Sequence, residues 1–200
     1  MHIAIIGATG SIGTITRTYF LDNGNDFLTL VARSFPSSLT IDPRREQVVV
    51  ADVTDPASLH GILQGQDAVF AALSGDLPAM ARALVNTMDE AGVQRLLFIS
   101  SMGIYDEIPA SVGVEGNLSH NPMLLPYRQA ADIIEASDLN YTVIRPGWFD
   151  NGPADDYQVT HKGEPFGGHD VARRSIADLV FRLAHDPHLG SRDSLGINRR

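Results

Sequence analysis

A glycine-rich turn near the start of the chain is the sequence feature that most constrains the fold. The apolar run at residues 3–6 leads directly into the segment GATGSIG at residues 7–13, and residues 12–21 continue with a helical pattern. Three glycines at this spacing suit a strand–turn–helix unit, in which they permit a tight bend, a close backbone approach to a pyrophosphate, and close helix–strand packing. Amides at the start of the helix then face the phosphates. We therefore predict a dinucleotide-binding turn, with a purely structural turn as the alternative.

Apolar runs of strand length alternate with helical patterns along the chain. The strands are rich in branched and aromatic residues without strict alternation, as expected when both faces of a sheet are covered. Further strands are predicted at residues 27–32, 48–51, 68–72, 96–100 and 141–144, and helices at residues 56–64, 77–91 and 123–137. Repeated β–α units predict an α/β fold with a doubly wound parallel sheet, that is, a Rossmann fold.

The pattern weakens after Trp148. A strand at residues 158–162, an amphipathic helix at residues 171–185 and a short strand at residues 194–198 are predicted there. We expect a single domain spanning residues 1–200, in which residues from about 147 to 200 form a small cap on the carboxyl edge of the sheet.

Composition and charge restrict the cellular location and the binding partners that we expect for this protein. The 200 residues include no cysteine, which excludes disulfides, thiolate metal sites and cysteine nucleophiles. A net charge of −9 disfavours nucleic acid as a partner, because phosphate binding depends on lysine and arginine. No apolar run approaches the roughly 20 residues that span a bilayer. The first predicted strand begins at His2, so we expect no signal peptide, no membrane association and a cytoplasmic location.

No metal site is expected either. His161, His169 and His185 are scattered along the sequence, and Asp150, Asp155 and Asp156 have the pattern of a solvated loop.

The residue that follows the second strand indicates which dinucleotide is bound. In NAD-binding versions of this unit an acidic residue about 20 positions after the glycines holds the ribose hydroxyls. Counting from Gly13 leads instead to Arg33, followed by Ser34. A guanidinium there can pair with a 2′-phosphate and lie on the adenine, while Ser34 adds a hydrogen bond. We therefore predict NADP as the cofactor, with NAD less favoured; a solvated arginine at a strand end is the alternative.

Several segments together resemble a known family. GATGSIG, LVARS, VVVADVTD, GQDAVFAALSG and RPGWF occur in the order typical of the atypical short-chain dehydrogenases/reductases, over about residues 1–185. The sequence is most similar to the NmrA-like or NAD(P)H-binding branch, which includes flavin and biliverdin reductases. The resemblance implies the fold and the cofactor, and says much less about the reaction.

The resemblance also implies roles for individual residues. Asp52 would accept from the adenine amino group, or alternatively cap a turn. Ser100 and Ser101 would face the nicotinamide, or simply end a strand. The turn Arg145-Pro146-Gly147 would lie near the carboxamide, or be purely structural. The full set of implied cofactor-binding residues is Gly7, Thr9, Gly10, Ser11, Ile12, Gly13, Arg33, Ser34, Asp52, Val53, Ala71, Ala72, Leu73, Ser100, Tyr127, Pro146 and Trp148.

The catalytic pattern of the superfamily is broken in this sequence. Its Tyr-x-x-x-Lys dyad uses a lysine to lower the tyrosine pKa, but Tyr127 is followed four residues later by Ala131. Counting back 14 residues from Tyr141 places Tyr127 at the lysine position and Met123 at the tyrosine position, so the dyad is absent in either register. Tyr127 and Ser100 remain the candidate catalytic residues, and Tyr105 is a second candidate phenol.

Three functions are compatible with this sequence. The favoured one is an NAD(P)H-dependent oxidoreductase that reduces a small planar or carbonyl acceptor such as a flavin, quinone, aldehyde or ketone. Hydride transfer to a flavin, quinone or tetrapyrrole needs no amino-acid acid. Trp148 and Phe149 would stack on such a molecule, or alternatively seal the core. A non-catalytic NADP(H) sensor acting through a protein partner, and an epimerase or dehydratase, are the alternatives. A monomer or a homodimer is expected.

Overall fold

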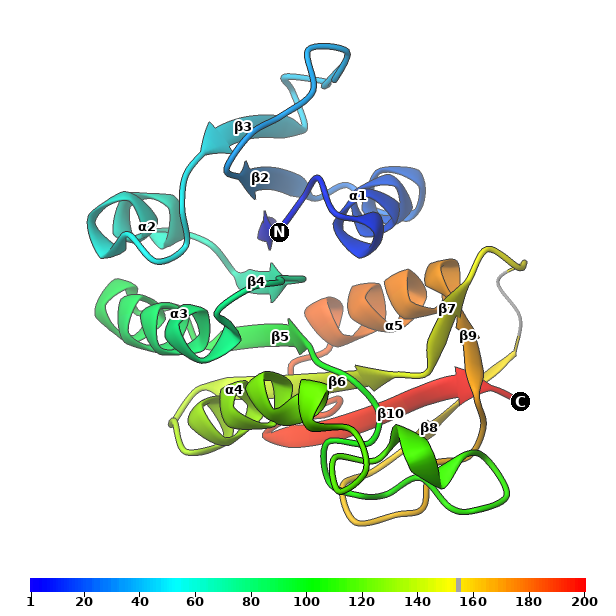
Figure 1. Cartoon of the computed structure of the whole chain (residues 1–200). Helices are drawn as coiled ribbons and strands as arrows, with labels where there is room; N and C mark the ends of the chain where they lie inside the picture. Colours follow the sequence, from blue (N-terminus) through cyan, green and yellow to red (C-terminus); the bar gives the residue numbers. More distant parts are fainter. Residues whose placement is uncertain (154–155) are drawn as a thin grey trace.

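The computed structural model describes residues 1–153 and 156–200, so Asp155 of the predicted acidic loop lies outside the described residues. An eight-stranded sheet with the order β3-β2-β1-β4-β5-β6-β10-β8 forms its centre (Figure 1). All pairings among its first seven strands are parallel. The chain moves outward from β1 to β2 and β3, then returns to place β4 on the other side of β1. This order confirms the predicted doubly wound Rossmann fold and places its switch point between β1 and β4.

The elements follow the predicted alternation closely. The sheet strands are β1 (His2–Ile6), β2 (Phe27–Ala32), β3 (Glu46–Val50), β4 (Ala68–Ala71), β5 (Arg95–Ile99), β6 (Asn140–Pro146), β8 (Tyr157–Thr160) and β10 (Asp193–Arg199). The helices are α1 (Ser11–Asn23), α2 (Pro56–Leu63), α3 (Leu77–Ala91), α4 (Leu125–Glu135) and α5 (Arg173–His185). Short turns η1 (Val114–Gly116) and η2 (Pro122–Leu124) precede α4, and β7 (Trp148–Asp150) pairs with β9 (Asp170–Ala172).

Two layers of helices cover the sheet (Figure 1). Apolar side chains of α2, α3 and α4, including Leu59, Leu84 and Ile134, pack on one face with the inward residues of the strands. On the other face α1 and α5 pack together, with Phe20 and Leu183 fully buried. Aspartates cap two helices: Asp55 accepts from the amide of Ala57 (3.2 Å) and Asp76 from that of Ala79 (3.1 Å). The carboxyl ends of parallel strands lie at the same edge of the sheet. The loops that follow these strands therefore come together at that edge.

The C-terminal quarter of the chain departs from the predicted cap. Strand β10 extends the main sheet in parallel beside β6, β8 adds an antiparallel edge strand, and α5 covers the sheet. Among the strands of residues 1–153 and 156–200, the pair β7–β9 forms a separate small sheet apart from the main sheet (Figure 1). Local patterns do not predict this arrangement, because β10 pairs with β6, which lies far away in the chain. Its apolar residues Leu195 and Ile197 are nonetheless core residues.

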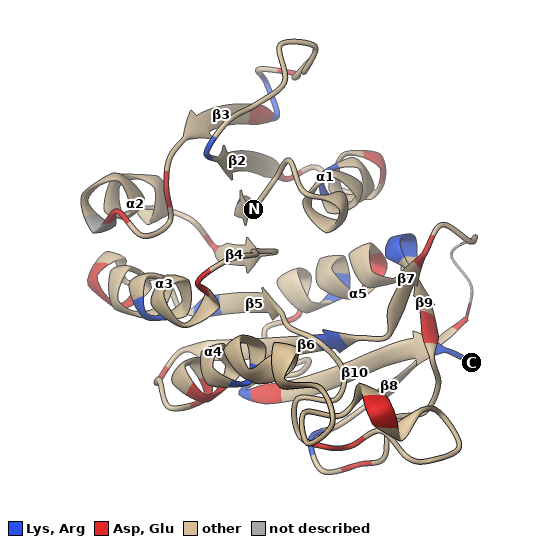
Figure 2. Cartoon of the chain, in the orientation of Figure 1, with Lys and Arg blue, Asp and Glu red and all other residues tan. Residues whose placement is uncertain are grey.

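Charged residues are distributed over the helices and loops with both signs interspersed (Figure 2). Within residues 1–153 and 156–200, none of the helices combines the length and apolar character needed to cross a membrane. No set of three or more histidine, aspartate or glutamate side chains in this part of the chain is placed to hold a metal ion.

Candidate functional site

The glycine turn after β1 is tied to both neighbouring strands. The amides of Gly7 and Ala8 both donate to the carbonyl of Val31 in β2, at 2.9 and 3.1 Å. Gly7 has φ +85°, and a Cβ atom there would lie 2.1 Å from the carbonyl oxygen of Ala72, just after β4. Only glycine fits a position that is both left-handed and this close to backbone. The first glycine therefore sets the turn at the switch point.

The start of α1 presents backbone donors that the helix itself does not satisfy. The first amides of the helix, at Ser11, Ile12 and Gly13, have no partner within a helix, and Gly10 supplies no capping side chain. A Cβ at Gly13 would lie 2.2 Å from the Gly7 carbonyl oxygen, so this glycine allows the helix to close on the turn. A Cβ at Gly10 would meet only that same oxygen, at 3.2 Å, and otherwise open space. The turn thus forms a bare, positively polarised cradle that fits a pyrophosphate.

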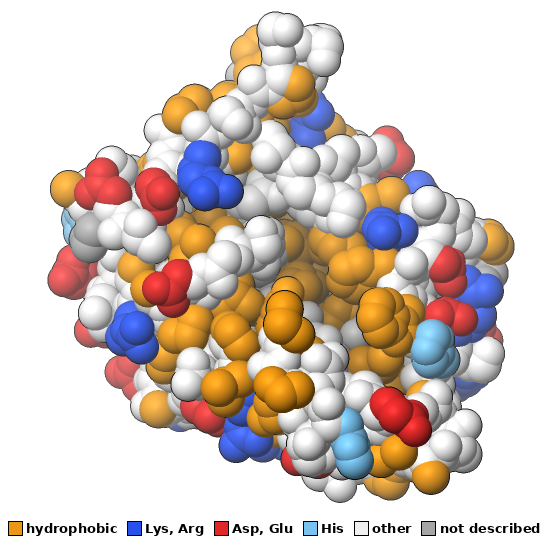
Figure 3. All heavy atoms as spheres, viewed as in Figure 1, with side chains coloured by type: hydrophobic (Ala, Val, Ile, Leu, Met, Phe, Trp, Pro, Cys, Tyr) orange, Lys and Arg blue, Asp and Glu red, His pale blue; other side chains and the backbone are white. Residues whose placement is uncertain are grey.

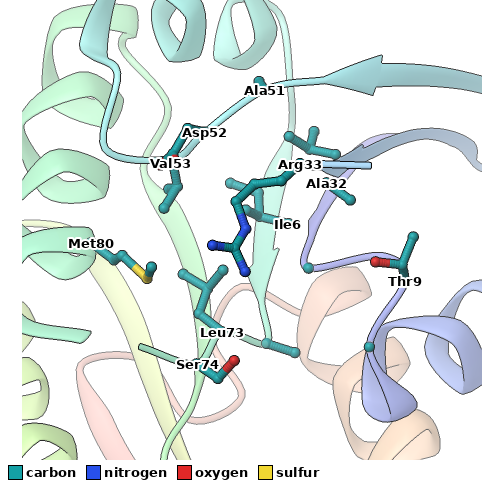
Figure 4. Close-up of a pocket in the computed structure, with 14 residues that line it drawn as sticks. Ile6, Thr9, Ala32, Arg33, Ala51, Asp52, Val53, Leu73, Ser74 and Met80 are labelled. Atoms are coloured by element: carbon teal, nitrogen blue, oxygen red, sulfur yellow. The ribbon is translucent and has the colours of Figure 1, made fainter. Parts of the chain in front are cut away.

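A cavity of about 170 Å³ lies at the ends of β1, β2, β3 and β4 (Figure 4). The Arg33 side chain points into it from the end of β2 (Figure 4). Apolar side chains form most of its walls, as a purine ring requires. The residues that line it are Ile6, Gly7, Thr9, Gly10, Val31, Ala32, Arg33, Ala51, Asp52, Val53, Ala72, Leu73, Ser74 and Met80.

Asp52 forms hydrogen bonds within its own turn and also lines this cavity. Its Oδ1 accepts from the amide (2.9 Å) and the hydroxyl (2.7 Å) of Thr54, which leaves Oδ2 without a hydrogen bond from the described residues. The hydrogen bonds from Thr54, with a further contribution from the charge of Arg33, hold the pKa of Asp52 below its usual value. Both predicted roles of Asp52, turn formation and an acceptor facing the cavity, are compatible with this geometry.

A second cavity, of about 370 Å³, lies at the ends of β5 and β6. Its walls come from the loop after β5, from η1, η2 and α4, and from the start of β7. The residues that line it are Ser100, Ser101, Met102, Gly116, Asn121, Met123, Leu124, Tyr127, Pro146, Gly147, Trp148 and Phe149. A space-filling view shows a hollow surrounded by hydrophobic side chains on one face of the molecule (Figure 3).

Two hydroxyl groups of the second cavity have no hydrogen bond from the residues that the structure describes. Ser100 is only 4% exposed, and its Oγ has no partner there. A buried hydroxyl without a hydrogen bond destabilises the folded protein unless a ligand or a water molecule forms that bond. Tyr127 of α4 is half-buried and also lines this cavity, and its hydroxyl likewise forms no hydrogen bond with the described residues. By contrast, Ser101 Oγ donates to the carbonyl of Met102 (3.1 Å).

The loop after β5 is held by a buried ion pair. Arg145 of β6 is fully buried and forms a salt bridge with Glu107, which is itself nearly buried. The Glu107 carboxylate also accepts from the amides of Gly103 (3.0 Å) and Tyr105 (2.9 Å). Arg145 further donates to the hydroxyl (3.0 Å) and carbonyl (3.1 Å) of Ser194. The arginine of the Arg-Pro-Gly turn therefore has a structural function and fixes one wall of the second cavity.

Aromatic side chains of β7 stand at the mouth of the second cavity. Trp148 is 59% exposed and Phe149 40% exposed. The Trp148 ring stacks on His169 with 6.1 Å between ring centroids, and the guanidinium of Arg173 lies 5.4 Å from the Phe149 ring. A Cβ at Gly147 would lie 2.4 Å from the carbonyl oxygen of His169, so β7 can pair with β9 only because glycine precedes it.

The glycine turn and the two cavities at the carboxyl ends of a Rossmann sheet agree with a family match over most of the chain. The family profile described as NAD(P)H-binding matches residues 7–187. The chain belongs to this NAD(P)H-binding family. The glycine turn and both cavities lie within the matched region, which also includes α5.

Known relatives of this NAD(P)H-binding protein are similar over nearly their whole length. A Rossmann-fold NAD(P)-binding family protein from Shigella flexneri is 34% identical, with a TM-score of 0.85 over 99% of this chain and 93% of that chain. A short-chain dehydrogenase/reductase from Veillonella parvula DSM 2008, solved in complex with NADP, is 25% identical, with a TM-score of 0.88 over 99% and 94% of the two chains. The uncharacterized sugar epimerase YhfK of Bacillus subtilis (strain 168) is 26% identical over 194 residues, covering 90% of this chain and 88% of that protein.

The structure brings most of the predicted residues of this family member to the two cavities, with some exceptions. Ala71 is fully buried at the end of β4 and lines neither cavity, so its predicted place beneath the ribose stays a prediction. Ser34 is exposed but does not line the first cavity. Ser11, Ile12 and Gly13 also lie outside that lining, at the start of α1 where their backbone amides have no partner within a helix.

The prediction of Tyr105 as a catalytic phenol is wrong. Its hydroxyl binds Glu135 of α4 and lies 3.3 Å from Ser194 Oγ, and Tyr105 does not line the second cavity. Burial, with the hydrogen bond to Glu135, raises the pKa of Tyr105 well above its ordinary value. Cationic groups of Arg128 and Lys162 lie 5.0 and 4.5 Å from its ring centroid. Tyr105 is therefore part of the packing behind the cavity wall.

Sequence reasoning missed several residues that line the cavities. Ser74 and Met80 reach the first cavity from the segment that leads into α3 and from the first turn of that helix. Met102, Gly116, Asn121 and Leu124 reach the second cavity from the long connection between β5 and α4. That connection has no apolar periodicity, so no local signal placed these residues.

Proposed function

We propose that this protein is an NADPH-dependent oxidoreductase that reduces a small acceptor bound in the second cavity. The observation that carries this proposal is the pairing of two cavities across the switch point. One is lined by a guanidinium and by the glycine turn that leads into α1, and the other is lined by both the unpartnered Ser100 hydroxyl and Tyr127. In open α/β sheets the ligand lies at the carboxyl ends of the strands on both sides of this point.

The first cavity supports a preference for NADP over NAD. Arg33 points into it and no carboxylate takes the place at the end of β2 where NAD-binding proteins carry one. A guanidinium forms two parallel hydrogen bonds to a phosphate, whereas it gains less from a ribose hydroxyl. The Veillonella relative was solved in complex with NADP, which is consistent with this assignment. Gly7, Thr9 and Gly10 would approach the pyrophosphate, with Asp52 and Val53 beside the adenine.

The second cavity supports hydrogen bonding to an acceptor without a strong acid. NADPH, when bound, supplies a hydride. Ser100 and Tyr127 would each donate a hydrogen bond to the acceptor oxygen that gains negative charge. Ala131 stands where a lysine would follow Tyr127 by one helical turn, and it is fully buried. We therefore assign these hydroxyls to orientation and hydrogen bonding, and assign the proton to solvent.

Two other functions remain as alternatives to the reductase. The Bacillus subtilis relative bears the name of a sugar epimerase, but an epimerase of this superfamily depends on the tyrosine–lysine dyad that this chain lacks. A redox sensor would bind the cofactor in the same way and transfer no hydride. Since the unpartnered hydroxyls point to a ligand other than the cofactor's phosphates, we favour the reductase.

The test is NADPH oxidation, followed by absorbance, with a panel of quinones, flavins, aldehydes and ketones. We expect sustained turnover with at least one acceptor and a large loss in Gly10→Ala, whose methyl group would project into the cradle. Ser100→Ala should lower kcat more than it changes the affinity for NADPH. Tight binding of both oxidised and reduced cofactor without turnover on any acceptor would contradict the reductase and favour the sensor.

A further inference from the structure

We propose that the second cavity selects an uncharged, flat and largely apolar acceptor that carries a carbonyl oxygen, the chemistry of a quinone. This inference rests on the proposed reductase function and goes further by naming the substrate class. It excludes acceptors that carry a phosphate, a sulfonate or a nucleotide diphosphate. The charge, shape and hydrogen-bonding groups of the cavity lining support it.

The lining of the second cavity contains no charged side chain among the residues that the structure describes. Two arginines that adjoin lining residues already form contacts with other groups. Arg145 is fully buried and paired with Glu107. Arg173 donates to Asn151 Oδ1 (2.8 Å) and covers the Phe149 ring. An anionic substrate held within this lining would therefore lose hydration with no cationic side chain among the lining residues, which is unfavourable.

Apolar and aromatic groups dominate the walls of this cavity. Met102 and Leu124 are buried, at 6% and 8% exposed, and form its inner part. Met123, 78% exposed, stands with Trp148 and Phe149 at the mouth. Large exposed apolar side chains around one hollow mark a site for an apolar ligand. Aromatic rings and methionine favour flat, polarizable partners, because they stack on them or contact their edges.

The cavity lining also offers neutral hydrogen-bonding groups. Among the described residues, neither Ser100 Oγ nor the Tyr127 hydroxyl has a hydrogen-bond partner. A carbonyl oxygen accepts from hydroxyl donors, whereas a sugar would need many more polar partners than this lining offers. One carbonyl at the Ser100 end, with a flat ring between the methionine and aromatic side chains, satisfies all of these groups.

The reaction balances for a quinone. The acceptor gains a hydride and one proton from solvent, so that a quinone becomes a hydroquinone and NADPH becomes NADP⁺. One C–H bond of the nicotinamide breaks, one O–H bond forms with the hydride's electron pair at the acceptor, and the second O–H bond forms with the solvent proton. No further oxidant, reductant or metal is required.

The test uses Trp148, the only tryptophan of the chain, as a reporter of occupancy at the cavity mouth. Its fluorescence is titrated in protein saturated with 1,4,5,6-tetrahydro-NADP, whose nicotinamide ring is uncharged and transfers no hydride, with 1,4-naphthoquinone and with 1,4-naphthoquinone-2-sulfonate. The two ligands share one ring system and differ in charge. N-acetyltryptophanamide corrects for collisional quenching. We expect saturable quenching by the naphthoquinone and binding of the sulfonate weaker by about tenfold or more. Equal or tighter binding of the sulfonate would overturn the inference.

A variant that adds a cation to the rim provides a matched control. Met123→Arg changes an exposed side chain, so the fold should persist. We expect the difference between the two ligands to shrink severalfold, because the sulfonate gains a partner while the parent quinone does not. An unchanged ratio would contradict the assignment of the ligand to this cavity.

Failure of the inference can be told apart from failure of the proposed function. If riboflavin and its phosphorylated form FMN support equal NADPH oxidation at rates above that of the quinone, the reductase stands and the substrate class is wrong. If naphthoquinone binds as expected but no acceptor supports NADPH oxidation, the cavity assignment stands and the reductase is wrong.

Discussion

Replacement of Glu107 by glutamine should destabilise the protein far more than its conservative appearance indicates. The carboxylate is the counter-charge of Arg145, which is fully buried, and it also accepts from the amides of Gly103 and Tyr105. In Glu107→Gln the arginine charge loses its partner, and the new NH₂ group stands opposite an amide donor. Removing one partner of a buried pair costs about 3–5 kcal/mol. For a domain of this size, each kcal/mol lowers Tm by roughly 2–4 °C.

Urea unfolding and a thermal melt followed by circular dichroism measure the effect. The double variant Glu107→Gln/Arg145→Met removes the charge and fills its space with apolar atoms of similar length. We expect it to regain about 2 kcal/mol or more relative to Glu107→Gln, since replacing a buried pair with apolar residues is often close to neutral. If Glu107→Gln loses less than about 1 kcal/mol, or if the double variant is the less stable of the two, then the ion pair does not hold the loop as described.

Three other variants or conditions test the two cavities and the tyrosines outside them. Arg33→Ala should weaken NADP binding by about tenfold to a hundredfold and change NAD binding little, as measured by calorimetry, because only NADP offers the 2′-phosphate. Gly10→Ala should lower the melting temperature only slightly, since its φ of −72° suits alanine while the added Cβ would lie 3.2 Å from the Gly7 carbonyl oxygen, and yet abolish detectable cofactor binding. Burial and a hydrogen bond to Asp178 raise the pKa of Tyr19 and of Tyr157 to about 12. The stability that these two phenols contribute should therefore be complete below pH 10 and disappear as the pH rises toward 12. A flat profile of unfolding free energy across that interval would refute this.

Local sequence patterns were sufficient to predict the parts of the site that lie at strand ends. The turn at Gly7, the guanidinium of Arg33 and the hydroxyl of Ser100 each follow a recognisable strand, and parallel strands must bring their carboxyl ends together. The doubly wound sheet follows from the same alternation. Tyr127 and Trp148 also lie in the second cavity, because each flanks an element with a clear boundary.

The parts that sequence could not predict depend on contacts between distant segments. The wall formed after β5 is fixed by Glu107, whose partner Arg145 lies 38 residues further along the chain. Tyr105 is a plausible catalytic phenol in sequence, but Glu135 and Lys162 enclose it from two separate elements. The strand β10 pairs with β6 in the main sheet rather than forming a cap. No local periodicity carries this information.

The central claim is that backbone amides at the start of α1 bind a dinucleotide pyrophosphate while Arg33 selects the additional phosphate of NADP. Isothermal titration calorimetry of the unmodified protein with NADP⁺ and, separately, with NAD⁺ tests it most directly. The account predicts saturable heat with both and tighter binding of NADP⁺ by about tenfold or more. Absence of heat with both dinucleotides, or tighter binding of NAD⁺, would contradict it.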